Sequence, residues 1–219
     1  AAEERISNWT PKTELGRKVV SGEITTVQEA LASGLPLREA PIVDLLITDL
    51  MEEVIDIHMV QRMSDSGRRV RFAVTTIVGN GDGVVGIGRV SGKLVRPTIT
   101  KALDRAKLNI IEVRRGSGSW ECSTAVPNSL PFEVSGRTGS TRVRIKPAPP
   151  GVGLVTNQVG KIMLKLAGIE DAWSFTRGQT QTIYNFASAM FKALEKTRST
   201  KLLPGQEDFH NMIKGVKQE

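Results

Sequence analysis

Hydrophobic and polar positions in the first half of the chain follow two periods, which predict a helix, three strands and a second helix in that order. Apolar residues recur at helical spacing over 37–54 and again over 96–113, whereas 54–62, 68–78 and 84–92 alternate as half-buried strands do. The expected helical stripes are Ile42, Leu45, Leu46, Leu50 and Val54 in the first helix and Ile99, Ala102, Leu103, Ala106 and Ile110 in the second. A three-stranded antiparallel sheet with helices on one face is the simplest packing of this order.

The second half of the chain predicts another small unit of the same kind. Two strands are expected within 132–149, a helix over 157–168 that stops at Gly168, a strand over 171–178 and a helix over 180–197. The apolar stripes of the two helices are Val159, Ile162, Met163 and Leu166, and Ile183, Phe186, Ala187, Met190 and Leu194. The predicted fold class is therefore α+β, with two small α/β sandwich domains.

Clusters of glycine, serine and proline set the expected domain limits, because such clusters are typical of turns and connections. We predict an acidic N-terminal extension over 1–37 with one short helix near 25–33, a first domain over 38–113, a linker over 114–131, a second domain over 132–197 and a C-terminal tail over 198–219.

Charge is distributed unevenly along the chain. The 219 residues have a net charge of +7, yet residues 1–60 carry −6, residues 61–160 carry +10 and residues 161–219 carry +3. A basic segment of this kind attracts polyanions such as nucleic acid. A solvated basic surface accounts for the charge alone equally well, so the arrangement of the basic residues has to decide.

Composition narrows the compartment and the kind of chain. The single cysteine, Cys122, allows neither an internal disulfide nor a thiolate zinc cage, which favours a reducing cytoplasm. Aspartate interrupts the apolar runs well short of the roughly 18 residues of a membrane span, and the first ten residues hold no apolar signal core. We expect a cytoplasmic protein without a membrane partner.

The stretch GNGDGVVGIG, residues 79–88, places Gly81, Gly83 and Gly86 at the G-x-G-x-x-G spacing of phosphate-binding loops. A dinucleotide-binding loop needs a helix to begin at the third glycine, and residues 87–92 lack a helical stripe. Kinase strings such as H-R-D and D-F-G are absent, and neither Gly-Lys pair fits a P-loop. A hairpin turn is the favoured interpretation, and a nucleotide-dependent enzyme is the alternative.

Gly86 and Gly88 pose a second question, because they leave one face of the third predicted strand without side chains. Such a face allows close approach by RNA backbone or by a neighbouring protein, or it lets the adjacent helix pack tightly over the strand. The sequence leaves both explanations open.

No catalytic or metal-binding constellation is expected. His58 falls on the polar side of a predicted strand and His210 in the tail, so neither is placed to activate a serine or cysteine nucleophile. Cys122, close to Trp120, fits a packing role. We expect a chain that is not an enzyme and that uses no metal, no cofactor and no small-molecule substrate.

Basic residues are organised in rows of a single sign. Arg142, Arg144 and Lys146 alternate with Val143 and Ile145, which places three cations about 7 Å apart on one strand face, near the phosphate repeat of a nucleic-acid strand. An exposed face kept soluble by charge usually mixes signs. The predicted RNA-binding residues are Arg62, Arg68, Arg69, Arg71, Lys93, Arg96, Lys101, Arg105, Arg114, Arg115, Arg137, Arg142, Arg144 and Lys146. With only 5% aromatic residues, contact with phosphate and sugar of folded RNA is favoured over base stacking.

Four strings also resemble one protein family, the archaeal and eukaryotic branch of the ribosomal small-subunit protein five family. They are SGRRVRFAVTTIVGNGDGVVGIG (66–88), RPTITKALDRAKLNIIEV (96–113), VSGRTGSTRVRIKPAPPGVGLV (134–155) and GKIMLKLAGIEDAWSFTRG (160–178). The resemblance covers roughly residues 40–197. It implies a first domain like double-stranded-RNA-binding domains and a second, compact β-α-β domain.

The same resemblance implies a role in the small ribosomal subunit. It implies binding to ribosomal RNA near the mRNA entrance and the decoding region, beside small-subunit proteins four and eight, with an influence on translational accuracy. The positions that match the contact with protein four lie near Gly151, Gly153 and Lys161. A protein-interaction module whose acidic head binds a basic partner is a third hypothesis.

Overall fold

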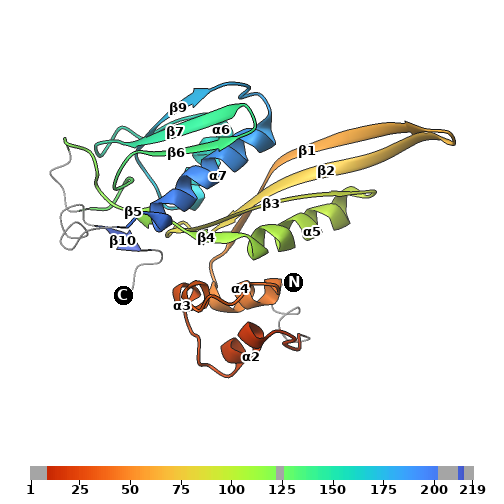
Figure 1. Cartoon of the computed structure of the whole chain (residues 1–219), viewed down its shortest axis with the longest axis horizontal. Helices are drawn as coiled ribbons and strands as arrows, with labels where there is room; N and C mark the ends of the chain where they lie inside the picture. The colour runs from red at the N-terminus through yellow and green to blue at the C-terminus, as the bar shows by residue number, and fades with distance from the viewer. Residues whose placement is uncertain (1–8, 122–125, 202–211, 215–219) are drawn as a thin grey trace.

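The computed structural model describes residues 9–121, 126–201 and 212–214, which form two main sheets with helices between and around them (Figure 1). Cys122 and His210 lie outside the described residues. No helix within these residues combines the length and the apolar character needed to cross a lipid bilayer.

The first sheet contains four antiparallel strands in the order β1-β2-β3-β4. These are β1 (Met51–Ser64), β2 (Gly67–Gly79), β3 (Val84–Gly92) and β4 (Ile110–Glu112), and α5 (Val95–Leu108) packs across one face. The three predicted strands and the helix after them are confirmed. Ile110 is a correction, because the helix ends at Leu108 and Ile110 pairs with Gly86 in β4, a strand that the periodicity did not reveal.

The helix expected over 37–54 is correct only in its first half. Helix α4 (Ala40–Leu46) buries Ile42, but the chain is already extended at Met51. Val54 belongs to β1, where it pairs with Thr76 and is 39% exposed. Long-range pairing with β2 therefore overrides a local pattern that fits a helix equally well.

The N-terminal segment forms two short helices, α2 (Glu14–Val20) and α3 (Val27–Ala32), where the sequence predicted one. Glu39 ties the segment to the first domain, since its carboxylate accepts hydrogen bonds from the Trp9 Nε1 (2.7 Å) and the Thr13 backbone N–H (2.6 Å). Burial alone would raise the pKa of Glu39, but these hydrogen bonds outweigh it and lower the pKa. A small core of its own, formed by Leu15, Ile24, Ala30 and Ile42, holds the segment in place.

The second sheet has the order β6-β7-β9-β8, with β8 and β9 parallel and the other pairs antiparallel. Its strands are β6 (Val134–Thr138), β7 (Thr141–Pro147), β8 (Leu154–Val155) and β9 (Ala172–Arg177), and its helices are α6 (Gln158–Leu166) and α7 (Ile183–Ser199). The predicted strands and helices are confirmed, as is the stop at Gly168, which has φ +75°. The two-residue β8 completes a β-α-β unit with α6 and β9.

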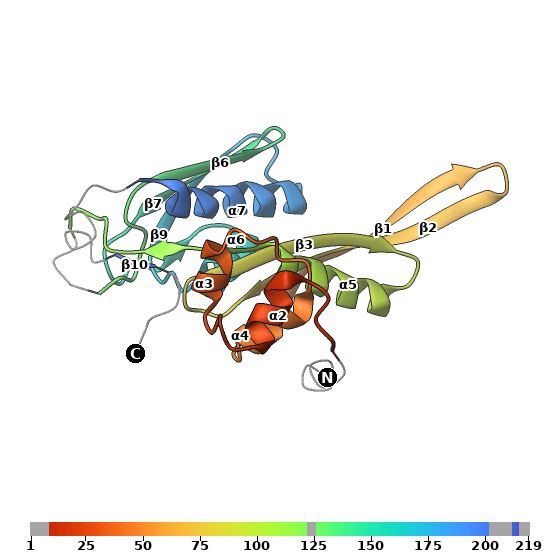
Figure 2. The same cartoon turned by 60° about the horizontal axis from the view of Figure 1, so that its bottom comes forward.

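Helices α6 and α7 lie between the two sheets and join them into one core (Figure 1). Ile77 and Ile87 of the first sheet, Met163 and Phe191 of the helices and Ile145 of the second sheet belong to the same buried cluster. The other face of the first sheet is covered by α5 and by the N-terminal helices (Figure 2). The segment between the sheets includes β5 (Arg114–Arg115), which pairs with β10 (Ile213–Lys214).

The glycine-rich turn at 79–83 connects β2 and β3 and caps a helix. The backbone N–H groups of Gly81 and Gly83 donate to the carbonyl oxygens of Leu166 and Ala167 (2.9 and 3.1 Å), at the C-terminal end of α6. Asn80 closes the turn by accepting from the backbone N–H of Val84 (3.0 Å). The N–H groups that a phosphate would need are occupied by helix carbonyls, so the turn is an interdomain contact and not a nucleotide cradle.

Gly86 and Gly88 lie under α5. A methyl group added at Gly88 would overlap the carbonyl oxygen of Ala102, and one at Gly86 would overlap that of Ala106. Of the two explanations that the sequence left open, tight packing of the helix is correct, because the bare strand face is covered within the chain.

Candidate nucleic-acid interface

The predicted row of cations on β7 is arranged as the alternation indicated. Arg142 and Arg144 are exposed and Lys146 is half-buried, whereas Val143 and Ile145 on the other face are 1% and 0% exposed. Helix α7 covers the apolar face of this sheet. The strand therefore presents its cations to solvent on the side away from the core.

Strand pairing adds two arginines to this row. Arg142 lies directly opposite Arg137 of β6 on one side and Arg177 of β9 on the other, so three arginine side chains project from neighbouring positions on one face. Like charges directly opposite in a sheet are destabilising. Arg137 belongs to the predicted set and Arg177 does not, because the pairing that brings β9 beside β7 is not visible in the sequence.

The charge of this face is concentrated at its Arg142 end. Glu133 pairs with Arg144 (3.1 Å) and Lys146 (3.5 Å) and so partly neutralises the other end. Arg142 forms no ion pair with any residue that the structure describes. The exposed ring of Phe175 lies on the same face under the ammonium of Lys146, 5.5 Å from the ring centre, so an aromatic surface is present where the sequence indicated none.

A second basic surface lies on the hairpin arm. This arm is the part of β1 and β2 over residues 60–71, beyond the pairing of β2 with β3, and it projects from the body of the protein (Figures 1 and 2). Arg62 pairs with Arg69, and Val60 with Arg71, so these three arginines share one face. They line a cleft of about 700 Å³ together with Arg89 of β3. The arm cleft, as we call it, brings together three of the predicted residues and adds Arg89.

Arg68 pairs with Met63 and lies on the opposite face of the arm. Lys93, Arg96, Lys101 and Arg105 are exposed at the end of β3 and along α5. They are therefore accessible to a partner but do not form one row.

Arg115 is the buried member of the predicted set. Its side chain is 6% exposed and forms an ion pair with Asp82 of the glycine-rich turn, which places the guanidinium inside the junction between the sheets. Arg114 is half-buried and donates from Nη1 to the carbonyl oxygen of Thr200 (3.0 Å). In the chain itself, the charge of Arg115 is paired with Asp82 and is not presented to solvent.

The predicted protein-contact positions lie on an exposed loop and at the start of α6. Gly151 and Gly153 have φ +91° and +73°, with open space beside both. The buried carboxylate of Asp171 accepts a hydrogen bond from the Gly153 backbone N–H (2.6 Å) and fixes the end of the loop. Lys161 is exposed. The loop is held at its base and accessible at its tip.

Metal-binding geometry is not found in the part of the chain that the structure describes. Nowhere in it do three histidine, cysteine, aspartate or glutamate side chains gather in a way that could hold a metal ion. His58 Nδ1 lies 2.9 Å from Asp56 Oδ2 on the same strand, in a part-buried pair at the surface of β1.

Two family models match the chain, one for each sheet. The model described as ribosomal protein S5, N-terminal domain, matches residues 50–114, and the model described as ribosomal protein S5, C-terminal domain, matches residues 136–206.

Curated relatives match nearly the whole chain and carry the name small ribosomal subunit protein uS5. The protein from Picrophilus torridus is 57% identical over 196 residues, which cover 90% of this chain and 89% of the relative. The protein from Thermoplasma volcanium is 52% identical with the same coverage, and the one from Methanococcoides burtonii is 50% identical over 91% of this chain and 95% of the relative.

Proposed function

The chain belongs to the ribosomal protein S5 family, and we propose that it binds the RNA of the small ribosomal subunit through the sheet face centred on Arg142. Its relatives are named as ribosomal proteins and not as enzymes, which confirms the expectation of a structural, non-catalytic chain. The cytoplasmic location expected from the sequence follows from membership in this ribosomal family.

The observation that carries the proposal is the alignment of Arg137, Arg142 and Arg177 across three strands. Three cations abreast without an acidic partner at Arg142 repel one another in the free protein. Binding a phosphate backbone turns this repulsion into attraction and releases condensed counterions, which is the main source of affinity for nucleic acid. The arrangement of the three cations is therefore more favourable when a polyanion is bound than when only water surrounds them.

The hairpin arm provides a second, separate surface for RNA contact. Arg62, Arg69 and Arg71 face one side of a two-stranded ribbon that leaves the body of the protein (Figure 2). A ribbon of this kind reaches between RNA helices, where the body itself does not fit, and its arginines contact phosphates on the way. Lys93, Arg96, Lys101 and Arg105 add charge along α5.

The proposed position of the chain within the small ribosomal subunit rests on the family resemblance. We place the chain near the mRNA entrance and the decoding region, beside small-subunit proteins four and eight, where it supports assembly and translational accuracy. The accessible loop with Gly151 and Gly153 and the exposed Lys161 are the proposed contact with protein four. Replacement of the exposed Lys161 should alter accuracy without disturbing either sheet, whereas any side chain at Gly151 or Gly153 would strain the positive-φ backbone.

The RNA-binding face is tested by replacing Arg142, Arg144 and Lys146 together with alanine. We expect weaker binding to small-subunit RNA at every sequence tested, and a salt dependence of log K that is flatter by up to about 0.7 to 0.9 for each phosphate that the variant no longer neutralises. Arg142→Ala alone should account for the largest share, since Glu133 already offsets the other two cations. The measurement is fluorescence anisotropy over a range of roughly 50 to 200 mM salt.

The matched control removes the same charge elsewhere, at the exposed residues Lys12, Lys165 and Lys201. It should lower affinity only slightly and leave the salt slope close to that of the unaltered protein. Co-sedimentation with the small subunit in a sucrose gradient tests assembly directly. Equal salt slopes for the triple variant and the unaltered chain would remove β7 from the interface.

A further inference from the structure

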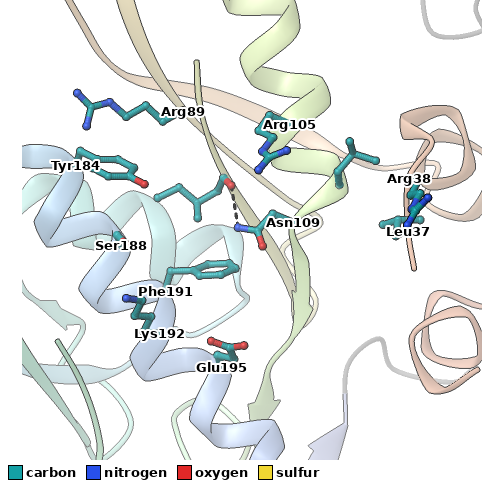
Figure 3. Close-up of a pocket in the computed structure, with 12 residues that line it drawn as sticks. Leu37, Arg38, Arg89, Arg105, Asn109, Tyr184, Ser188, Phe191, Lys192 and Glu195 are labelled. Carbon is teal, nitrogen blue, oxygen red and sulfur yellow. Dashed lines mark hydrogen bonds between the residues drawn. The ribbon is translucent and has the colours of Figure 1, made fainter. Parts of the chain in front are cut away.

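A cleft of about 600 Å³ opens where the two sheets meet, between α5, α7 and the edge of β3 (Figure 3). Its apolar floor is made by Ile87, Leu108 and Phe191, of which Phe191 is only 6% exposed. The volume is within the range of pockets that hold small organic groups, about 300 to 1,000 Å³. We call this the junction cleft.

Four cations surround the junction cleft and one carboxylate opposes them. Arg38 comes from the segment before α4, Arg89 from β3, Arg105 from α5 and Lys192 from α7, with Glu195 one turn beyond Lys192. None of these four cations forms an ion pair within the described ranges. A net charge of three positives over an apolar floor fits a ligand with both a phosphate and a flat apolar part.

A stacking surface lies at the mouth of the junction cleft. The guanidinium of Arg89 sits over the ring of Tyr184, 4.4 Å from its centre, and Figure 3 shows both side chains at the same end of the cleft. Every base has a π-face, and stacking on aromatic and arginine side chains binds bases without regard to sequence. The Arg89–Tyr184 pair therefore offers a flat, charged surface for an unpaired base.

The edge of β3 supplies backbone hydrogen-bonding groups to the same space. Strand β4 pairs with β3 only as far as Gly86, and beyond it the Ile87 carbonyl oxygen accepts from Asn109 Nδ2 (3.1 Å). Because strand residues alternate, the backbone groups of Arg89 face the same edge as those of Ile87. The backbone N–H and C=O of Arg89 therefore point toward the edge of β3 that β4 does not pair.

We propose that the junction cleft holds an unpaired nucleotide of a single-stranded RNA segment, whose base stacks at Arg89 and Tyr184 and whose phosphates lie between Arg38, Arg105 and Lys192. The proposal rests on the RNA-binding function proposed above and specifies a site and a kind of RNA within it. None of the residues in the β7 row takes part.

An RNA strand fits better than a free nucleotide because the cations continue beyond the cleft. Arg89 lines both the junction cleft and the arm cleft, and the arm cleft adds Arg62, Arg69 and Arg71. A single nucleotide reaches only the first set, whereas a strand that leaves the junction cleft at Arg89 follows the second set along the arm. The number of neutralised phosphates, and with it the affinity, rises accordingly.

The test uses the full chain and two labelled probes, an oligouridine of about 12 nucleotides and an RNA duplex of about 12 base pairs, within the usual site size of single-strand binding proteins. Tyr184→Leu should weaken binding of the single strand by about tenfold, since one base no longer stacks. Tyr184→Phe keeps the ring and should bind as the unaltered chain does. Arg105→Ala with Lys192→Ala should weaken the single strand more than Lys12→Ala with Lys165→Ala, which removes the same charge outside the cleft. Duplex binding should change less than about twofold in the Tyr184 variants, and the Arg105→Ala, Lys192→Ala variant should lose less affinity for the duplex than for the single strand.

Retained thermal stability shows that a variant still folds. If Tyr184→Leu does not fold, the Arg105→Ala, Lys192→Ala variant replaces it in the test, because both of its changes are at exposed positions. Equal losses for the strand and the duplex, or no loss for either, would overturn the cleft proposal while the RNA-binding role stands. Competition by free uridine monophosphate below millimolar concentration would also overturn it, in favour of a small-molecule site. Failure of the unaltered chain to bind either RNA would instead count against the proposed function.

Discussion

Gly88→Val should strongly lower the free energy of unfolding of the chain. The new side chain would overlap the carbonyl oxygen of Ala102 and the backbone of Ala106, which belong to the helix packed over β3. Neither is the flexible end of a side chain, so the whole of α5 has to move away from the sheet. We expect a loss of about 3 kcal/mol or more from a total of roughly 5 to 15 kcal/mol. Guanidinium chloride unfolding followed by circular dichroism measures it.

Ser91→Val is the matched control for this change. Ser91 is an exposed residue of the same strand, three positions on, so the β-branched side chain is added where there is room. The control should change stability by no more than about 0.5 kcal/mol. A Gly88→Val protein that folds normally yet no longer binds RNA would show that the glycine face contacts a partner, against the packing described above.

The glycines of residues 79–88 show which features the sequence could predict and which it could not. Turn chemistry correctly indicated a hairpin at 79–83, and the alternation on either side fixed its strands. What the turn and the strand glycines contact was not readable, because Leu166 and Ala102 are brought there by tertiary packing. The same limit explains Val54 and Ile110, whose local spacing fits a helix while long-range pairing places both in strands.

The candidate site also contains residues that the sequence could predict and residues that it could not. Arg142, Arg144 and Lys146 were predictable because alternation within one strand determines which side chains share a face. Arg177 joins them only through the pairing of β9 with β7, and Arg89 meets Tyr184 only because α7 packs beside β3. The burial of Arg115 was not predictable, since the sequence does not reveal that Asp82 lies within reach of its side chain.

Lys107 is another cation whose role depends on distant residues. It lies on α5 with its side chain 6% exposed, and its ammonium is 2.7 Å from both Asp44 Oδ1 and Glu52 Oε1. It therefore joins α5 to α4 and to the start of β1. Burial alone would lower the pKa of Lys107, but the hydrogen bonds and charges of the two carboxylates outweigh it and raise the pKa.

Lys107→Met should cost about 3 to 5 kcal/mol, because it leaves the carboxylate of Asp44, itself 6% exposed, buried without a cation. Lys101→Met, on the exposed side of the same helix, is the control and should cost less than about 0.5 kcal/mol. Asp44→Asn in the Lys107→Met background should restore part of the loss by removing the unpaired charge. If Lys107→Met is no more harmful than Lys101→Met, the buried pair does not hold α4 in place.

The pH dependence separates the ion pair from simple loss of packing. A lysine pKa that is raised on folding contributes stability in full below the unfolded value of about 10.4, and this contribution is lost as pH rises through the folded pKa. The unaltered chain should therefore lose stability above about pH 10.4. The Lys107→Met variant has no lysine to titrate at this position, so its free energy of unfolding should not fall for this reason. The two unfolding free energies should approach each other in strong base. A difference between the two unfolding free energies that stays constant from about pH 7 to about pH 11 would mean that Lys107 stabilises the contact of α5 with α4 and β1 only through its aliphatic chain.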